Sequence, residues 1–177
     1  MFGRPFQVRL AALTALVTLA VLLLGSLVYQ EQAKAAPLER DLAAVPGVGG
    51  VTVDRAAGQW RIRVRLQGVD LLPVTYRELR QRADQRLGAG HYVLELDDTR
   101  NGRLEQAFYQ VSYFLEEART RGDYAQAARH VEEEGRRLGL ERARLYVDPD
   151  YLYLELADEG AALYHVQPLR PAEVTAR

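Results

Sequence analysis

Side chains able to perform catalysis or to hold a metal are few and scattered in this chain of 177 residues. The three histidines, His91, His130 and His165, lie far apart and lack the short spacings typical of zinc sites. Cysteine is absent, which excludes thiolate catalysis, disulfides and cysteine-ligated metals. Ser112, the one serine after residue 30, falls in a predicted helix and not on the sharp turn of a hydrolase nucleophile. The sequence therefore predicts no catalytic residue, no metal and no cofactor.

Acidic residues form two groups that superficially suggest calcium loops. Residues 97–102 carry oxygen donors at alternate positions, but Phe108 occupies the place of the bidentate glutamate of an EF-hand. The end of a strand followed by a helix cap explains this segment. Asp148 and Asp150 flank a proline, and a turn between two strands explains both, with weak calcium binding as the alternative. A hydrolase that uses carboxylates alone also remains open, because spacing in sequence does not reveal spatial separation.

Arginine at every second position is the most distinctive exposed pattern. Arg61, Arg63 and Arg65 occupy one face of a predicted strand, with stems about 7 Å apart. The opposite face is apolar and consists of Trp60, Ile62, Val64 and Leu66. One interpretation is a basic stripe that contacts anionic lipid headgroups, wall polymer or an acidic partner. The other is a solvated sheet face neutralised by Glu95 or Asp97 on a neighbouring strand.

Tyrosine is abundant, with ten residues. Tyr109 and Tyr113 lie on the side of a predicted helix that faces away from its apolar stripe, and Tyr151 and Tyr153 share one face of a strand. Tyrosine is enriched in interfaces, so these four residues join the three arginines as a candidate interaction surface. The alternative for the helical pair is packing under the following helix.

The charge balance sets limits on the partners of this chain. Twenty-three basic and 24 acidic residues give a net charge of −1, so no overall field attracts nucleic acid. We therefore expect no nucleic-acid partner. Residues 38–169 have the size of a single domain with its own core.

The N-terminal region predicts a membrane anchor. Residues 10–29 carry no charge and are long enough to cross the bilayer hydrocarbon, which takes about 20 helical residues. Residues 1–9 are cationic and are expected to stay in the cytoplasm as a short tail. The alternative is a cleaved signal peptide, with a small-x-small triplet at residues 33–35. Both interpretations place the domain outside the cytoplasm. A retained anchor holds it at the plasma membrane, after a linker over residues 30–37.

Hydrophobic periodicity predicts an α+β domain over residues 38–169 and a flexible tail over residues 170–177. The expected element order is αββαβ-αα-βββ, with helices packed on one mainly antiparallel sheet. Thr75 with Glu78 predicts a capping box for the second helix, and Asp98 or Thr99 predicts the cap of the third. Asp123 is expected to cap the fourth helix.

Two segments resemble known modules. Residues 45–53 read Val-Pro-Gly-Val-Gly-Gly-Val-Thr-Val, and with the strand and helix that follow they resemble ferredoxin-like BON domains and ring-building modules of envelope complexes. This resemblance covers about residues 38–97 and implies a scaffold that oligomerises or docks partners. Residues 116–128 are similar to the corner of one tetratricopeptide repeat. Because solenoids need several stacked copies, we expect a single helical hairpin over about residues 104–138.

The sequence thus favours a membrane-anchored, extracytoplasmic envelope protein that is not an enzyme. We expect it to assemble with itself or with an envelope protein. The alternative is a module that binds a ligand or a polymer in a pocket between the sheet and the helical pair.

Overall fold

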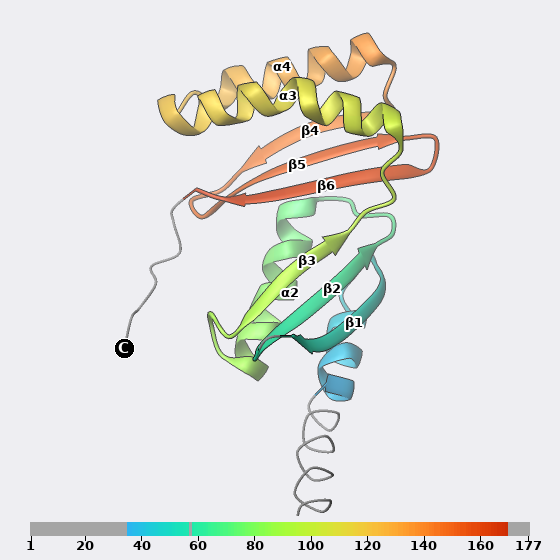
Figure 1. Ribbon diagram of the computed structural model, residues 1–177, viewed down its shortest axis with the longest axis vertical. Helices are drawn as coiled ribbons and strands as arrows, with labels where there is room; N and C mark the ends of the chain where they lie inside the picture. Colours follow the sequence, from blue (N-terminus) through green and yellow to red (C-terminus); the bar gives the residue numbers. More distant parts are fainter. Residues whose placement is uncertain (1–34, 57, 170–177) are drawn as a thin grey trace, which may run out of the picture.

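The computed structural model describes residues 35–56 and 58–169 (Figure 1). The predicted anchor over residues 10–29, the tails at 1–9 and 170–177 and most of the linker lie outside the described residues. Within the described ranges, no helix is both long and apolar enough to span a membrane. The predicted localisation therefore still rests on the sequence.

The α+β class and the order of elements are confirmed, but the strands form two small sheets instead of one. Helical residues 35–43 come first. The remaining elements are β1 (Val48–Ala56), β2 (Gln59–Leu66), α2 (Leu72–Leu87), β3 (Tyr92–Asp97), α3 (Gly102–Arg121), α4 (Tyr124–Leu138), β4 (Arg142–Val147), β5 (Tyr151–Asp158) and β6 (Ala161–Pro168).

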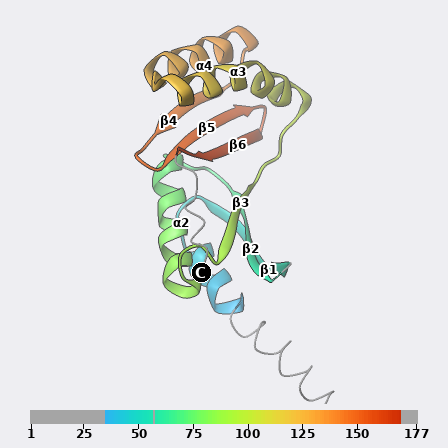
Figure 2. The ribbon, with the colours of Figure 1, turned by 60° about the vertical axis from the view of Figure 1, so that its left-hand side comes forward.

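The first sheet has the strand order β1-β2-β3, with β1 antiparallel and β3 parallel to β2. Helical residues 35–43 and α2 pack on one of its faces (Figures 1 and 2). Alternation in β2 explains this packing, because Ile62 and Val64 are fully buried while the arginines between them are exposed. The opposite face carries no helix or strand from the described part of the chain (Figure 2).

The second sheet, in the order β4-β5-β6, is entirely antiparallel. Helices α3 and α4 cover one face through the predicted stripe, of which Leu104, Val111 and Leu115 are buried. The other face packs against the first half of the molecule, which comprises the first sheet and the helices packed on it. There Tyr153 joins the core of the first sheet. β5 is therefore covered on both sides.

The prediction of one sheet is wrong because alternation identifies the faces of a strand but not its neighbours. Besides the side-chain packing between them, hydrogen bonds link the two sheets at Thr99, just beyond β3, and Ala162 in β6. Thr99 N donates to Ala162 O at 2.9 Å, whereas Ala162 N donates to the Thr99 side-chain oxygen at 3.0 Å. One of these two bonds uses the Thr99 side chain in place of a backbone carbonyl, and β3 and β6 do not pair as strands.

Two predicted helix caps are also wrong. α2 begins after Leu71 without a side-chain cap, and Thr75 is buried inside its first turns. At α3 the cap is Asn101, whose Oδ1 accepts from Leu104 N at 2.9 Å. The prediction for α4 is confirmed, since Asp123 Oδ1 accepts from Gln126 N at 3.1 Å.

Candidate functional site

The arginine face of β2 is present as predicted, and acidic side chains accompany it. Arg63 Nη2 lies 2.7 Å from Asp54 Oδ2, and Arg61 Nε lies 3.6 Å from Glu95 Oε1. The hydrogen bond that Arg63 donates to Asp54 raises the pKa of Arg63. Arg65 lies opposite Asp97 in the strand register. The face is thus a ladder of alternating charge, which favours specific pairing over attraction to any anionic surface.

Tyr109 and Tyr113 form an exposed aromatic pair on α3. Their side chains are 65% and 63% exposed, so they do not pack under α4. The rings lie edge to face with centroids 5.6 Å apart, and Tyr113 donates a hydrogen bond to the Tyr109 hydroxyl at 2.9 Å. This mutual contact orders two large side chains that have most of their surface in water.

Tyr151 and Tyr153 lie on the side of β5 that faces the first half of the molecule. Tyr153 is fully buried and Tyr151 is half-buried, so Tyr153 is not part of the exposed surface. Both rings pack against Tyr76 of α2, with centroids 5.4 Å and 5.7 Å from it. These tyrosines join the two halves of the chain.

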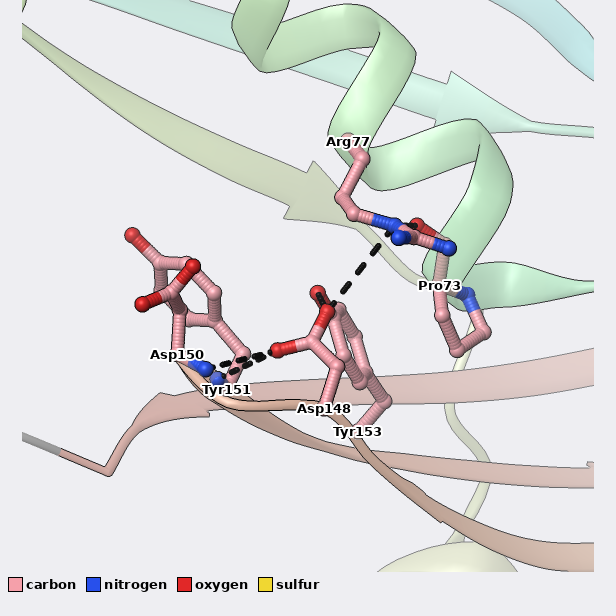
Figure 3. A network of polar contacts seen from close by, with 6 residues as sticks. All are labelled: Pro73, Arg77, Asp148, Asp150, Tyr151 and Tyr153. Atoms are coloured by element: carbon pink, nitrogen blue, oxygen red, sulfur yellow. Dashed lines mark hydrogen bonds and ion pairs between the residues drawn. The ribbon is translucent and has the colours of Figure 1, made fainter.

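Asp148 organises the turn between β4 and β5 (Figure 3). Its Oδ1 accepts from the backbone N of Asp150 at 2.9 Å and of Tyr151 at 2.8 Å. Its Oδ2 accepts from the Tyr153 hydroxyl at 2.7 Å, and burial together with this bond raises the pKa of Tyr153. Arg77 Nε of α2 lies 3.9 Å from Asp148 Oδ2. Oδ1 therefore holds the turn, and Oδ2 binds the Tyr153 side chain. The described residues hold no acidic or histidine cluster suited to a metal.

A groove of about 1140 Å³ separates α2 and β3 from the tip of the second sheet. Arg80 of α2 lies with its guanidinium carbon 5.1 Å from the Tyr151 ring centroid. On the same side of the groove, the Tyr92 hydroxyl of β3 donates to Asp84 Oδ1 of α2 at 2.8 Å. Burial, and next the bond to Asp84, raise the pKa of Tyr92 to about 12, so this hydroxyl stays protonated at neutral pH. The lining includes Gln59, Val93 and Pro168.

Sequence reasoning missed this groove because its walls come from three distant segments. Tyr76, Arg80 and Asp84 recur at helical spacing, a pattern equally typical of an ordinary helix surface. Tyr92, Leu94 and Leu96 occupy every second position, which predicts only a strand. The approach of the second sheet to α2 was the missing information.

The three histidines are not brought together. His91 is exposed, and His130 stacks on Phe114 with ring centroids 4.3 Å apart. His165 packs against Phe108 at 5.1 Å, and its burial lowers its pKa.

The geometry defines a two-sheet α+β protein whose notable features are a charged sheet face, an exposed tyrosine pair and one groove. The chain matches no protein-family model, no curated protein and no solved structure. Its function is therefore argued from its own residues.

Proposed function

We propose that this protein is a membrane-anchored, extracytoplasmic interaction module of the cell envelope, that it is not an enzyme, and that it assembles with itself or with an envelope protein. The observation that carries the proposal is the Tyr109–Tyr113 pair. Two adjacent aromatic side chains, each more than 60% exposed, offer the kind of apolar area with a polar tip that binding interfaces use.

The position of this pair suits a protein attached to a membrane by its N-terminal segment. The α3–α4 hairpin lies at the end of the molecule opposite helical residues 35–43 (Figure 1). An anchor over residues 10–29 would precede that helix directly in sequence. It would leave the tyrosine pair on the part of the domain most accessible to a partner.

The charged face of the first sheet provides a second contact surface. Arg61, Arg63 and Arg65 alternate with acidic neighbours on β1 and β3. A partner with the complementary pattern would exchange these surface ion pairs for intermolecular ones, which gives specificity more than affinity.

The first experiment measures the protein mass of the full chain in detergent by light scattering over a concentration series. We expect a discrete oligomer, and we expect Tyr109→Ser with Tyr113→Ser to shift it to monomer. Charge reversal of the three arginines to glutamate is expected to abolish the association as well. A matched control is Arg129→Glu on the exposed surface of α4, which should leave the mass unchanged.

A monomer at every concentration would remove self-assembly and leave a different protein as the partner. An oligomer that survives both sets of substitutions would contradict the assigned surfaces.

The groove beside α2 favours a second candidate function, the binding of a ligand or polymer. Native mass spectrometry of the purified chain tests it, because a monomer that carries a bound small molecule would favour this alternative.

A further inference from the structure

The edge of β3 opens into the groove at the start of the strand. Tyr92 and Val93 line this groove directly. The free edge of β1 is blocked, since Val53 N donates to Glu39 Oε1 at 2.9 Å. The edge of β6 is blocked at its start by the two bonds between Ala162 and Thr99. A chain segment that enters the groove therefore meets an open strand edge.

Hydrogen bonding within the sheet fixes which backbone groups β3 offers. Trp60 N donates to His91 O at 3.3 Å, and Trp60 lies opposite Tyr92 in the parallel register. In a parallel ladder, Trp60 therefore bonds to the residues on either side of Tyr92, and the odd-numbered residues of β3 point their N–H and C=O groups towards β2. The N–H and C=O groups of Tyr92, Leu94 and Leu96 point away from β2. No strand of the described chain pairs with these outward groups. They form a row of donors and acceptors with the spacing of an extended peptide.

Helix α2 lines the groove on the same side as β3, to which the hydrogen bond from the Tyr92 hydroxyl to Asp84 joins it. It presents two cations, Arg77 and Arg80, in a lining that also contains Asp84 and Asp150. Arg80 lies over the Tyr151 ring, and Tyr92 and Asp84 are among its polar neighbours. Arg77 is 61% exposed and lies 3.9 Å from Asp148, whose oxygens already accept three hydrogen bonds. Both guanidinium groups border the groove and can pair with an acidic side chain of a segment that enters it.

We infer that the groove binds an extended segment of a partner protein, which adds a strand to the edge of β3 and directs acidic side chains towards Arg77 and Arg80. Backbone pairing supplies the attachment, and the arginines select the sequence. This site lies apart from the tyrosine pair and adjoins the arginine face along β3. The inference goes beyond the proposed function, because it concerns a different occupant and does not depend on self-assembly.

A second copy of this chain is a poor occupant of the edge. Glu95 and Asp97 follow Val93 on β3, so pairing two β3 edges would bring acidic strands together. The partner is therefore expected to be another protein with acidic residues at alternate positions of an extended segment.

The test uses a fluorescent heptapeptide, Thr-Val-Glu-Val-Glu-Val-Thr, titrated against the full chain in nanodiscs. Its sequence is palindromic, so either strand direction presents both glutamates to α2 and the valines to the side of Val93. We expect saturable binding, with slower amide exchange confined to residues 92–96 by mass spectrometry. Replacing the glutamates of the probe by lysines should weaken binding about tenfold or more, and N-methylation of its alternate amides should abolish it.

The protein variant Arg77→Gln with Arg80→Gln should reproduce the loss seen with the lysine probe. Arg129→Gln with Arg136→Gln, on the exposed surface of α4, is the matched control and should bind the probe like the unaltered chain. The inference is overturned if the probe does not bind, if the glutamate and lysine probes bind equally, or if protection appears on another element. A chain whose β3 edge is protected by a second copy without any peptide would also overturn it.

Discussion

Arg142 and Glu155 form an ion pair across neighbouring strands at the junction of the two halves. Arg142 Nη1 of β4 lies 2.7 Å from Glu155 Oε1 of β5, and the same nitrogen lies 3.4 Å from the Val69 carbonyl oxygen that precedes α2. Glu155 is 1% exposed, and its Oε2 has no hydrogen-bond partner among the described residues. The hydrogen bond that Arg142 donates to Glu155 Oε1 raises the pKa of Arg142. One guanidinium therefore neutralises a buried carboxylate and also connects the second sheet to the first half of the molecule.

Removing this cation should destabilise the protein more than a surface substitution does. Arg142→Met leaves the Glu155 carboxylate buried without its partner, and we expect a loss of about 2–4 kcal/mol, reduced from the fully buried case because Arg142 is partly exposed. Urea unfolding measures this free energy. The double variant Arg142→Met with Glu155→Leu should recover most of the loss, because no buried charge remains. Equal stability of the single variant and the unaltered chain would contradict the role of the pair.

The burial of His165 predicts that the stability of the protein decreases at low pH. Burial lowers its pKa in the folded state, and a bond with Gln167 opposes this effect only in part. The unfolded chain, with an ordinary histidine pKa of about 6.5, binds the proton more readily. Stability should therefore be complete above pH of about 6.5 and should fall as the pH decreases through the folded pKa.

Unfolding measured from pH 8 to pH 5 tests this dependence (about the range of histidine titration). His165→Gln should remove much of the slope, whereas His91→Gln, at an exposed position, should keep it. A slope unchanged in His165→Gln would assign the titration to another group.

The sequence predicted what periodicity encodes and failed where distant segments meet. The exposed arginines between Ile62 and Val64, and the buried stripe of α3, follow from local spacing. By contrast, Tyr153 and Glu155 alternate with leucines and read as an exposed face, yet both are buried. β5 has the first half of the molecule on that side, and no local pattern reveals a second covering layer.

The helix α4 approaches β4 closely at Gly135. A Cβ at this position would lie 2.3 Å from the Ala143 Cβ, closer than two carbon atoms that are not bonded to each other can approach. Gly135→Ala should therefore destabilise the chain by about 1–3 kcal/mol, even though alanine favours the helix by about 1 kcal/mol. Thermal unfolding followed by circular dichroism measures the change.

A compensating variant separates this contact from other effects of the substitution. Gly135→Ala with Ala143→Gly should restore much of the stability, because it transfers the methyl group across the same contact. Gly102→Ala, where no atom lies within 4 Å of the added Cβ, should be neutral or slightly stabilising. Destabilisation by Gly102→Ala as large as that by Gly135→Ala would argue against a steric cause.

The start of α3 distinguishes the predicted cap from the observed one. Asn101 Oδ1 satisfies the Leu104 N–H, whereas Asp98 pairs with the side chain of Arg100. Asn101→Ala should cost about 1 kcal/mol, the usual value of an N-cap, and Asp98→Ala no more than about 0.5 kcal/mol. Urea unfolding of both variants under one condition gives the comparison. The reverse order of losses would mean that α3 begins where Asp98 could cap it, three residues before the helix start that this structure shows.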